Sequence, residues 1–338
     1  MGALYVVEPG ACVEREGQHL IVTRQGEVLN RVPVDMVDEV VLIGWTHATT
    51  PAILALLKKG IGLTLVSPSG KLCGRLTPAG NTRPMLHYRQ YQRGDDDHFC
   101  LELGRKFVFG KVYNARTFMR RILRKDEDTN NEDEWRFLTD EIEAIIDQVK
   151  ACPNLAALRG FEGVAVKKYF QLFKYDLEQH GFGFQKRQRR PPKDPVNSLL
   201  SLGYSLLTNT MISACEIAGL DAYAGFFHSE EYNRPALALD LIEEFRVPIV
   251  DTLVLRCFNR SIIEISDFYT GENGGLYLKN HALRTFLQQY VNRISTVVHH
   301  PELNRAVRYQ KYFELQAREL RKSIETNDTS HYTPFLYH

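Results

Sequence analysis

Residues 225–248 read GFFHSEEYNRPALALDLIEEFRVP and combine a histidine, a short polar loop and an apolar run that carries carboxylates. Asp240, Glu243 and Glu244 stand three and four residues apart, so a helix would place them on one face. The opposite face is apolar, which predicts its burial, and consists of Leu237, Leu239, Leu241, Ile242 and Phe245. Because clustered carboxylates repel one another, the segment predicts that a cation or a basic partner joins them.

The histidine of this segment, His228, indicates which cation would fit. Mixed imidazole and carboxylate ligation suits Mg²⁺ or Mn²⁺, and the imidazole favours Mn²⁺. Such an ion would polarise a phosphate oxygen and lower the pKa of an attacking hydroxyl group. The alternative stays open, because a histidine beside two phenylalanines is often structural and an acidic helix face is often merely solvated.

The composition is that of a soluble globular protein. The 338 residues suffice for two domains or one large one, with 44% hydrophobic and 25% charged residues. A net charge of +1 excludes a global polycation, so any affinity for nucleic acid has to come from local basic patches. The six cysteines include no C-x-x-C pair, and neither a signal peptide nor a membrane-spanning run is evident. We therefore expect a cytoplasmic protein without a zinc site or disulfides.

The sequence predicts an α+β protein in which a small β-rich domain precedes a larger helical one. Short, often alternating apolar runs separated by turn residues fill residues 1–80. A small antiparallel or sandwich-like domain is favoured over a doubly wound sheet, since long helical crossovers are lacking. Thr50 and Pro51 begin one helix, which Gly60 ends.

The rest of the chain reads as almost entirely helical. Residues 81–98 lose the strand pattern and are interpreted as a linker or domain junction. Residues 99–338 are predicted to form the all-α, catalytic domain, with helical periodicity interrupted by a polar, acidic loop at 125–135. The run at 101–125 is amphipathic, and we expect its basic face to be exposed.

Glu162 is a second candidate site residue. It stands in LRGFEGVAVKKYF, residues 158–170, where Gly160 and Gly163 would let a backbone or ligand approach closely. The alternative is a surface glutamate that pairs weakly with Arg159, and spacing alone favours that alternative.

A basic loop, GFQKRQRRPPKDPVN at residues 183–197, predicts phosphate binding. It carries five cations and one acid, Asp194. Arginine forks bind phosphate in a bidentate manner, and the double proline would preorganise them. The alternative is a solvated surface loop. The five cations are Lys186, Arg187, Arg189, Arg190 and Lys193.

Taken together, several stretches resemble the CRISPR-associated integrases of spacer acquisition, the universal adaptation endonucleases called Cas-one. The resemblance runs over nearly the entire chain, and five ordered motifs in the helical domain, together with one stretch in the β-rich domain, make it specific. These stretches are GWTHATTPAILALLKKGIGLTLVSPSGKLCGRL, LRGFEG, RRPPKDPVNSLLSLGYSLL, GFFH, LALDLIEEFRVPIVD and GGLYLKNHALRTFL.

The resemblance implies a catalytic metal site made by Glu162, His228 and Glu243. Asp240 would be a supporting acid one helical turn earlier, and Glu244 stays open as an alternative to Glu243 because both face Asp240 at helical spacing. The implied DNA-binding residues are the five cations of the basic loop together with Asn197, Arg234 and Arg246.

The resemblance also implies a reaction and partners. A DNA 3′-hydroxyl would attack a phosphodiester at the edge of a CRISPR repeat in a Mg²⁺- or Mn²⁺-dependent transesterification, which serves antiviral defence, and water at the same site would give a nuclease. The protein would form a homodimer through its β-rich domain and bind a small partner, Cas-two. The alternatives are a stand-alone nuclease that repairs branched DNA and an inactive DNA-binding scaffold.

Overall fold

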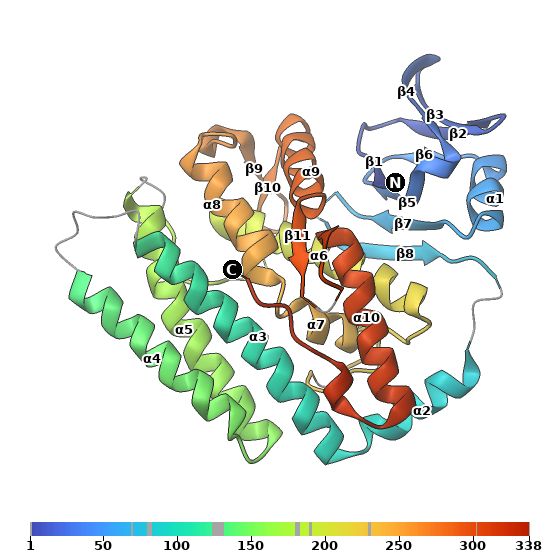
Figure 1. The fold of residues 1–338 in the computed structure, drawn as a ribbon. Helices are drawn as coiled ribbons and strands as arrows, with labels where there is room; N and C mark the ends of the chain where they lie inside the picture. The colour runs from blue at the N-terminus through green and yellow to red at the C-terminus, as the bar shows by residue number, and fades with distance from the viewer. Residues whose placement is uncertain are drawn as a thin grey trace.

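The computed structural model describes residues 2–68, 70–79, 83–123, 132–179, 183–188, 191–228, 231–301 and 303–337. A strand-rich N-terminal part packs against a larger helical body, as Figure 1 shows. This order confirms the predicted fold class. Among the described residues, no helix is both long and apolar enough to cross a membrane.

The described strands of the N-terminal part form two four-stranded sheets. In the first the order is β1 (Gly2–Val6), β5 (Val37–Ile43), β7 (Gly62–Val66), β8 (Leu72–Leu76). In the second it is β4 (Glu27–Pro33), β3 (His19–Arg24), β2 (Cys12–Glu16), β6 (His47–Ala48). The first sheet is mixed, because β5 pairs in parallel with both β1 and β7 whereas β7 and β8 are antiparallel, so the expected antiparallel pairing is found there only in part. Helix α1 (Thr50–Lys58), which the sequence predicted, belongs to the crossover that parallel pairing of β5 and β7 requires.

Strand β5 belongs to two cores because its side chains alternate. Val40 and Leu42 pack into a core shared with the second sheet, whereas Val41 and Ile43 belong to the core of the helical body. The first sheet is therefore covered on both faces, which explains why β5 is apolar over the unbroken run Val40–Ile43.

Buried polar contacts join the first sheet to helix α6 (Pro195–Ala218). Glu39 of β5 accepts a hydrogen bond from the hydroxyl of Ser213 on α6 at 2.9 Å. Arg75 of β8 donates to the same hydroxyl at 2.7 Å and forms an ion pair with Glu216 at 3.1 Å. These contacts fix the orientation of the N-terminal part on the helical body.

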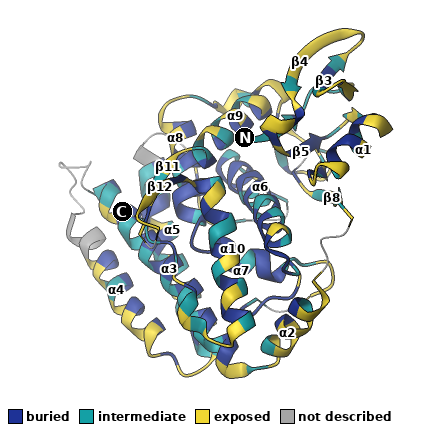
Figure 2. Cartoon of the chain, turned by 45° about the vertical axis from the view of Figure 1, so that its right-hand side comes forward, coloured by how far each residue is buried: buried dark blue, intermediate teal, exposed yellow. Residues whose placement is uncertain are grey.

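Helix α6 lies at the centre of the helical body, where Figure 2 shows it largely buried. Helices α3, α4 and α5 lie side by side at one edge, and α10 crosses in front of α6 (Figure 1). The remaining elements are α2 (Pro84–Gly94), α3 (Asp97–Leu123), α4 (Glu132–Lys150), α5 (Leu155–Gln179), α7 (Ala236–Ile242), the π-helix η2 (Arg246–Asp251), α8 (Thr252–Asn259), α9 (Asn280–Ile294), α10 (Tyr309–Thr326), and the short 3₁₀ helices η1 (Val34–Met36), η3 (Ile265–Asp267) and η4 (Thr329–His331).

Three details differ from the sequence-based expectations. The predicted linker at 81–98 contains helix α2 and the start of α3. The region after residue 99 is not all-α, because β9 (Phe268–Thr270) pairs with β10 (Leu276–Leu278) and β11 (Val297–His300) with β12 (Arg305–Arg308). Residues 125–131 of the predicted acidic loop lie outside the described residues, and α4 already begins at Glu132. The domain boundaries themselves stay predictions.

Candidate functional site

The turn that carries His228 is held by the carboxylate of Asp240. Its Oδ2 accepts hydrogen bonds from the backbone N–H groups of Phe226 at 2.7 Å and Phe227 at 3.0 Å, and its Oδ1 accepts from His228 N at 2.8 Å. The turn begins at Gly225, where a Cβ atom would lie 2.8 Å from the backbone of Ala236. Close approach of α7, rather than a left-handed backbone conformation, therefore requires glycine at this position.

The same carboxylate orients the imidazole of His228. Nδ1 lies 2.7 Å from Asp240 Oδ1, and because a carboxylate only accepts hydrogen bonds, Nδ1 carries the proton. Nε2 then has a free lone pair, and it lies 3.6 Å from Glu243 Oε1. A carboxylate that fixes the tautomer and orientation of a histidine in this way is typical of metal sites.

Lys111 of α3 joins the two other predicted ligands. Its ammonium group contacts Glu162 Oε1 on α5, and it lies 2.6 Å from Glu243 Oε2. Arg246 of the π-helix lies 3.1 Å from Glu243 Oε1. Burial alone would raise the pKa of the Glu243 carboxyl, but the cations Arg246 and Lys111 outweigh it and lower the pKa to about 2. Glu243 is therefore an ionised carboxylate at neutral pH.

The predicted alternative for Glu162, an ion pair with Arg159, is not what the structure shows. Arg159 instead donates a hydrogen bond to the carbonyl oxygen of Phe227 at 2.8 Å and so supports the histidine turn. Gly160 and Gly163, on either side of Glu162, face open space. The surface around Glu162 is therefore accessible to a large ligand.

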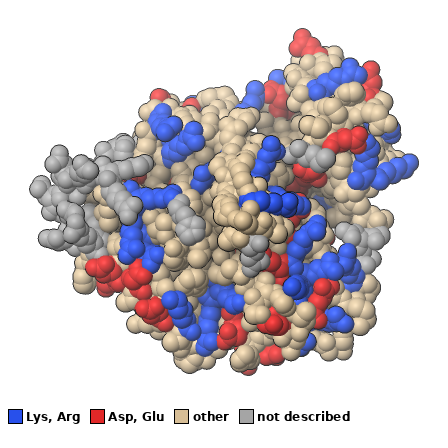
Figure 3. Space-filling view, viewed as in Figure 1, with Lys and Arg blue, Asp and Glu red and all other residues tan. Residues whose placement is uncertain are grey.

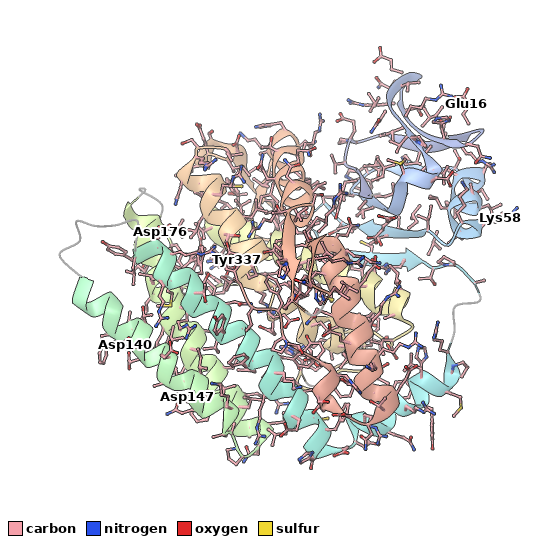
Figure 4. All side chains as sticks on the ribbon, viewed as in Figure 1. Glu16, Lys58, Asp140, Asp147, Asp176 and Tyr337 are labelled. Carbon is pink, nitrogen blue, oxygen red and sulfur yellow. The ribbon has the colours of Figure 1, made fainter. Side chains whose placement is uncertain are left out.

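Glu244 points away from His228 and Glu243. Its carboxylate accepts hydrogen bonds from Gln316 Nε2 at 2.8 Å, the hydroxyl of Tyr332 at 2.8 Å and the backbone N–H of Phe335 at 2.7 Å. Burial raises the pKa of the Glu244 carboxyl to about 8. Its role in this structure is to hold the C-terminal segment, whose Tyr337 is labelled in Figure 4.

The structure excludes the alternative of a solvated acidic face. Asp240, Glu243 and Glu244 are 0%, 2% and 0% exposed, so all three carboxylates are buried. Helix α7 ends at Ile242, and the two glutamates follow it in a turn before the π-helix begins. The three carboxylates therefore do not share one face, since Glu243 and Glu244 diverge.

A cavity of about 220 Å³ opens beside Glu162 and Lys111. Its lining also includes Arg187 and Arg246, whose guanidinium groups lie 5.4 and 5.0 Å from the ring centre of Tyr204. The hydroxyl of Tyr204 donates to Asp251 Oδ1 at 2.6 Å, and burial raises the pKa of this aspartate to about 6. Two arginines and a lysine thus give the cavity a positive lining beside the carboxylates.

The donor set fits the implied Mg²⁺ or Mn²⁺. It consists of two carboxylates and an imidazole nitrogen, and Glu243 Oε2 is buried without an aligned hydrogen bond although Lys111 is close. As arranged, no group of three His, Cys, Asp or Glu side chains in the described part of the chain is placed to hold an ion. Lys111 lies between Glu162 and Glu243 instead.

The predicted DNA-binding residues occupy different environments. Lys186 and Lys193 are exposed, whereas Arg187 is half-buried and donates to Asn197 Oδ1 and Ser201 Oγ. Arg234 forms an ion pair with Glu231, and Arg246 contacts Glu243. Arg189 and Arg190 lie outside the described residues. Basic and acidic side chains are interspersed over the face shown in Figure 3.

Asn197 is buried and its polar atoms are used within the protein. Its side-chain amide donates to Asp194 Oδ2 at 2.6 Å and to the Lys186 carbonyl at 2.9 Å, and its Oδ1 accepts from Arg187 and Gln188 N. Asp194 caps the N-terminus of α6 by accepting from Asn197 N. This geometry gives Asn197 the role of fixing the basic loop, so we leave it out of the proposed DNA surface.

Sequence reasoning missed Lys111, which is 8% exposed although the basic face of its helix was expected to be solvated. A signal was present, because Lys111 shares the apolar stripe of Val108, Val112 and Ala115 at helical spacing. A lysine within such a stripe predicts a buried ammonium group, which needs an anionic partner.

Known proteins resemble this chain along nearly its whole length. The family model described as CRISPR associated protein Cas1 matches residues 4–292. A CRISPR-associated endonuclease Cas1 of Thermus thermophilus is 36% identical, with 99% of this chain and 97% of that protein covered. The chain therefore belongs to the Cas1 family of CRISPR-associated proteins.

Solved structures share the fold. A casposase bound to integration product has a TM-score of 0.83 at 24% identity, and the match covers 100% of this chain and 95% of that one. A Cas6-RT-Cas1–Cas2 complex has a TM-score of 0.83 at 23% identity. That match covers 99% of this chain, which spans only 36% of the longer one.

Proposed function

We propose that this protein is a cytoplasmic, metal-dependent DNA endonuclease and integrase that inserts DNA fragments at CRISPR repeats in adaptation. The observation that carries the proposal is that helix α5 and the 225–248 segment bring Glu162, Glu243 and His228 together: Lys111 contacts both glutamates, and His228 Nε2 lies 3.6 Å from Glu243 Oε1. Membership of the Cas1 family supports it, as does the shared fold with a casposase bound to integration product.

The residues of the site would have different roles in metal binding. Glu162, His228 and Glu243 would hold Mg²⁺ or Mn²⁺, and such an ion supplies Lewis-acid stabilisation of the negative charge that develops on a phosphate. Asp240 accepts a hydrogen bond from Nδ1–H of His228, which leaves Nε2 free to bind the ion. Arg246 keeps Glu243 oriented and ionised.

DNA would reach this site along two features of the surface. Gly160 and Gly163 leave open space beside Glu162, where a DNA strand can lie close to α5. Arg187 of the basic loop contacts Asn197 and Ser201 of α6 and lines the cavity beside Glu162. The exposed Lys186 and Lys193, with Arg189 and Arg190, would contact phosphates, and Arg234 would add a further contact.

The N-terminal part would provide the homodimer contact. It exposes large apolar side chains that a monomer has no reason to leave in water, including Trp45, which is 78% exposed. The others are Val28, Leu29, Met36 and Leu54. A small partner, Cas2, would join the dimer, since one solved structure with this fold is a complex that contains Cas2.

Strand transfer tests the proposal directly. A labelled duplex fragment is incubated with a repeat-bearing plasmid, with and without Cas2, in Mg²⁺, Mn²⁺ or chelator. We expect joined product that requires metal, Cas2 and His228. Metal-dependent cutting without joining under every condition would favour a repair nuclease instead, and DNA binding without any chemistry would favour an inactive scaffold.

Variants of each proposed ligand assign the site. Glu162→Gln, His228→Ala and Glu243→Gln should each abolish strand transfer with the fold retained, as circular dichroism would show. Glutamine is the better replacement for Glu243, because alanine would leave Lys111 and Arg246 facing a buried hole. Full activity in any variant would remove that residue from the site.

A further inference from the structure

The ammonium group of Lys111 occupies the position between two carboxylates that come from different helices. It contacts Glu162 Oε1 and lies 2.6 Å from Glu243 Oε2, and it is 8% exposed. Glu162 itself is half-buried and Glu243 is 2% exposed. The acidic segment predicted that a cation or a basic partner joins its carboxylates. Lys111 is such a cation, because it joins Glu243 of that segment to Glu162 of α5.

The two carboxylates do not depend on Lys111 equally. Glu243 has a second cation, Arg246, 3.1 Å from Oε1, and the imidazole of His228 lies 3.6 Å from that same oxygen. Lys111 therefore acts mainly as a bridge between Glu162 and Glu243. A lysine suits such a bridge because its ammonium is a compact charge on a flexible stem of four carbons.

The contact between Lys111 and Glu243 is short but is not aligned as a hydrogen bond. Oε2 of Glu243 is buried and takes no aligned hydrogen bond, although the ammonium lies within contact distance. A buried oxygen with this geometry is satisfied by charge rather than by direction, and a metal ion provides charge without a directional proton. The oxygen is thus suited to exchange one cation for another.

We propose that Lys111 is an internal counter-ion that holds Glu162 and Glu243 together in the metal-free protein and leaves them when a divalent cation binds. The inference rests on the proposed function, because it uses the same metal site. The ammonium and a divalent cation repel each other and compete for the same two oxygens, so both cannot occupy the gap. The protein therefore binds the metal more weakly than its ligands alone would.

The displaced ammonium has a place to go. Lys111 lines the 220 Å³ cavity that opens beside Glu162, so its side chain has room to move, but Arg187 and Arg246 in the same lining disfavour a third cation until an anion is present. A DNA phosphate at the mouth of the cavity would attract the displaced lysine. DNA and metal then bind with positive coupling, since each favours the displaced position of Lys111.

Calorimetric titration of Mn²⁺ into the protein without DNA tests this inference. Lys111→Gln removes the competing charge and should bind Mn²⁺ at least about tenfold more tightly than wild type, a modest part of the repulsion expected at contact distance. Lys111→Arg retains the charge and should not gain affinity. An unchanged or weaker affinity of Lys111→Gln, with circular dichroism matching wild type, would overturn the proposal.

A second measurement uses the wild-type protein and so does not depend on the folding of a variant. Reductive methylation followed by mass spectrometry should label Lys111 faster in Mn²⁺ than in chelator, while exposed Lys150 on α4 reacts equally in both. Equal labelling of Lys111 in both conditions would overturn the displacement. Absence of Mn²⁺ binding to wild type and to both variants would instead overturn the metal-dependent function itself.

Discussion

Asp240 contacts His228 at both its backbone and its ring. The same oxygen, Oδ1, accepts from His228 N at 2.8 Å and lies 2.7 Å from Nδ1, while Oδ2 accepts from the two preceding residues. Asp240 is therefore a structural residue and a positioning residue at once, whereas His228 contributes mainly its free nitrogen.

This relationship predicts different costs for two neighbouring substitutions. Asp240→Ala leaves the N–H groups of Phe226 and Phe227 buried without acceptors, so the free energy of unfolding should fall by roughly 3 kcal/mol or more. His228→Ala should change it by no more than about 1 kcal/mol and still abolish strand transfer. Urea denaturation and strand transfer measure both effects. Equal destabilisation by the two variants would contradict the assignment.

Glu243 and Glu244 provide a matched pair of adjacent isosteric changes. Glu243→Gln should lower strand transfer by more than about 100-fold. Loss of a residue that only supports a metal ligand costs up to about 100-fold, and loss of a ligand should cost more. Glu244→Gln should retain most activity, because its carboxylate faces Gln316, Tyr332 and Phe335 instead of the site. Initial rates in Mn²⁺ measure both. The reverse order of activities would make Glu244 the ligand.

Asp251 predicts a pH dependence of stability. Burial raises its folded pKa to about 6, so between pH 4 and 6 the folded state binds more protons than the unfolded state, and stability falls as the pH rises. Above this window the full penalty, about 3 kcal/mol, applies. Asp251→Asn should therefore stabilise the protein at pH 8, with a gain that shrinks towards pH 4.5.

Thermal unfolding across this pH range measures the effect. Asparagine can still accept from one tyrosine hydroxyl and donate to the other, so Tyr169 and Tyr204 keep a partner. Asp147→Asn on the exposed surface of α4, labelled in Figure 4, is the control and should show no such trend. A pH-independent loss of stability in Asp251→Asn would show that the hydrogen bonds outweigh the charge.

The basic loop predicts a change in the salt dependence of DNA binding. Replacing Arg189 and Arg190 with alanine should weaken binding and reduce the magnitude of the slope of log K against log salt by about 1.8 on duplex DNA, because two counterions fewer are released. Lys58→Ala, on the N-terminal part, serves as the control (Figure 4). An unchanged slope in the double variant would place the DNA path elsewhere.

Most elements of the fold were predictable from periodicity, and the failures have identifiable causes. The strand β2 has a weak sequence pattern, because CVERE carries only one buried apolar side chain, Val13. The strands β11 and β12 were read as helix, since VVHH and RAVR adjoin strongly helical runs. Parallel pairing of β5 escaped notice because local patterns do not encode which strands become neighbours.

The site was only partly predictable from the residues themselves. Helical spacing predicted that Asp240, Glu243 and Glu244 lie together, but it indicated a surface position for Glu162. The full set of proposed metal ligands therefore came from the resemblance to a family. Tertiary packing then decided what spacing could not: Glu244 diverges to the C-terminal segment. Lys111 was overlooked because its partners come from residues 51 and 132 positions further along the chain.

The π-helix that follows Glu243 makes the length of this segment unusually sensitive. A π-turn contains an extra residue relative to an α-helix, and here Thr252 N bonds to the carbonyl of Val247, five residues back. Deleting one residue between 247 and 250 would let an ordinary α-helix form and rotate everything after it by about 100° relative to Arg246. Asp251 would then leave Tyr169 and Tyr204. Substitutions in this segment are thus easier to accommodate than the insertion or deletion of a residue.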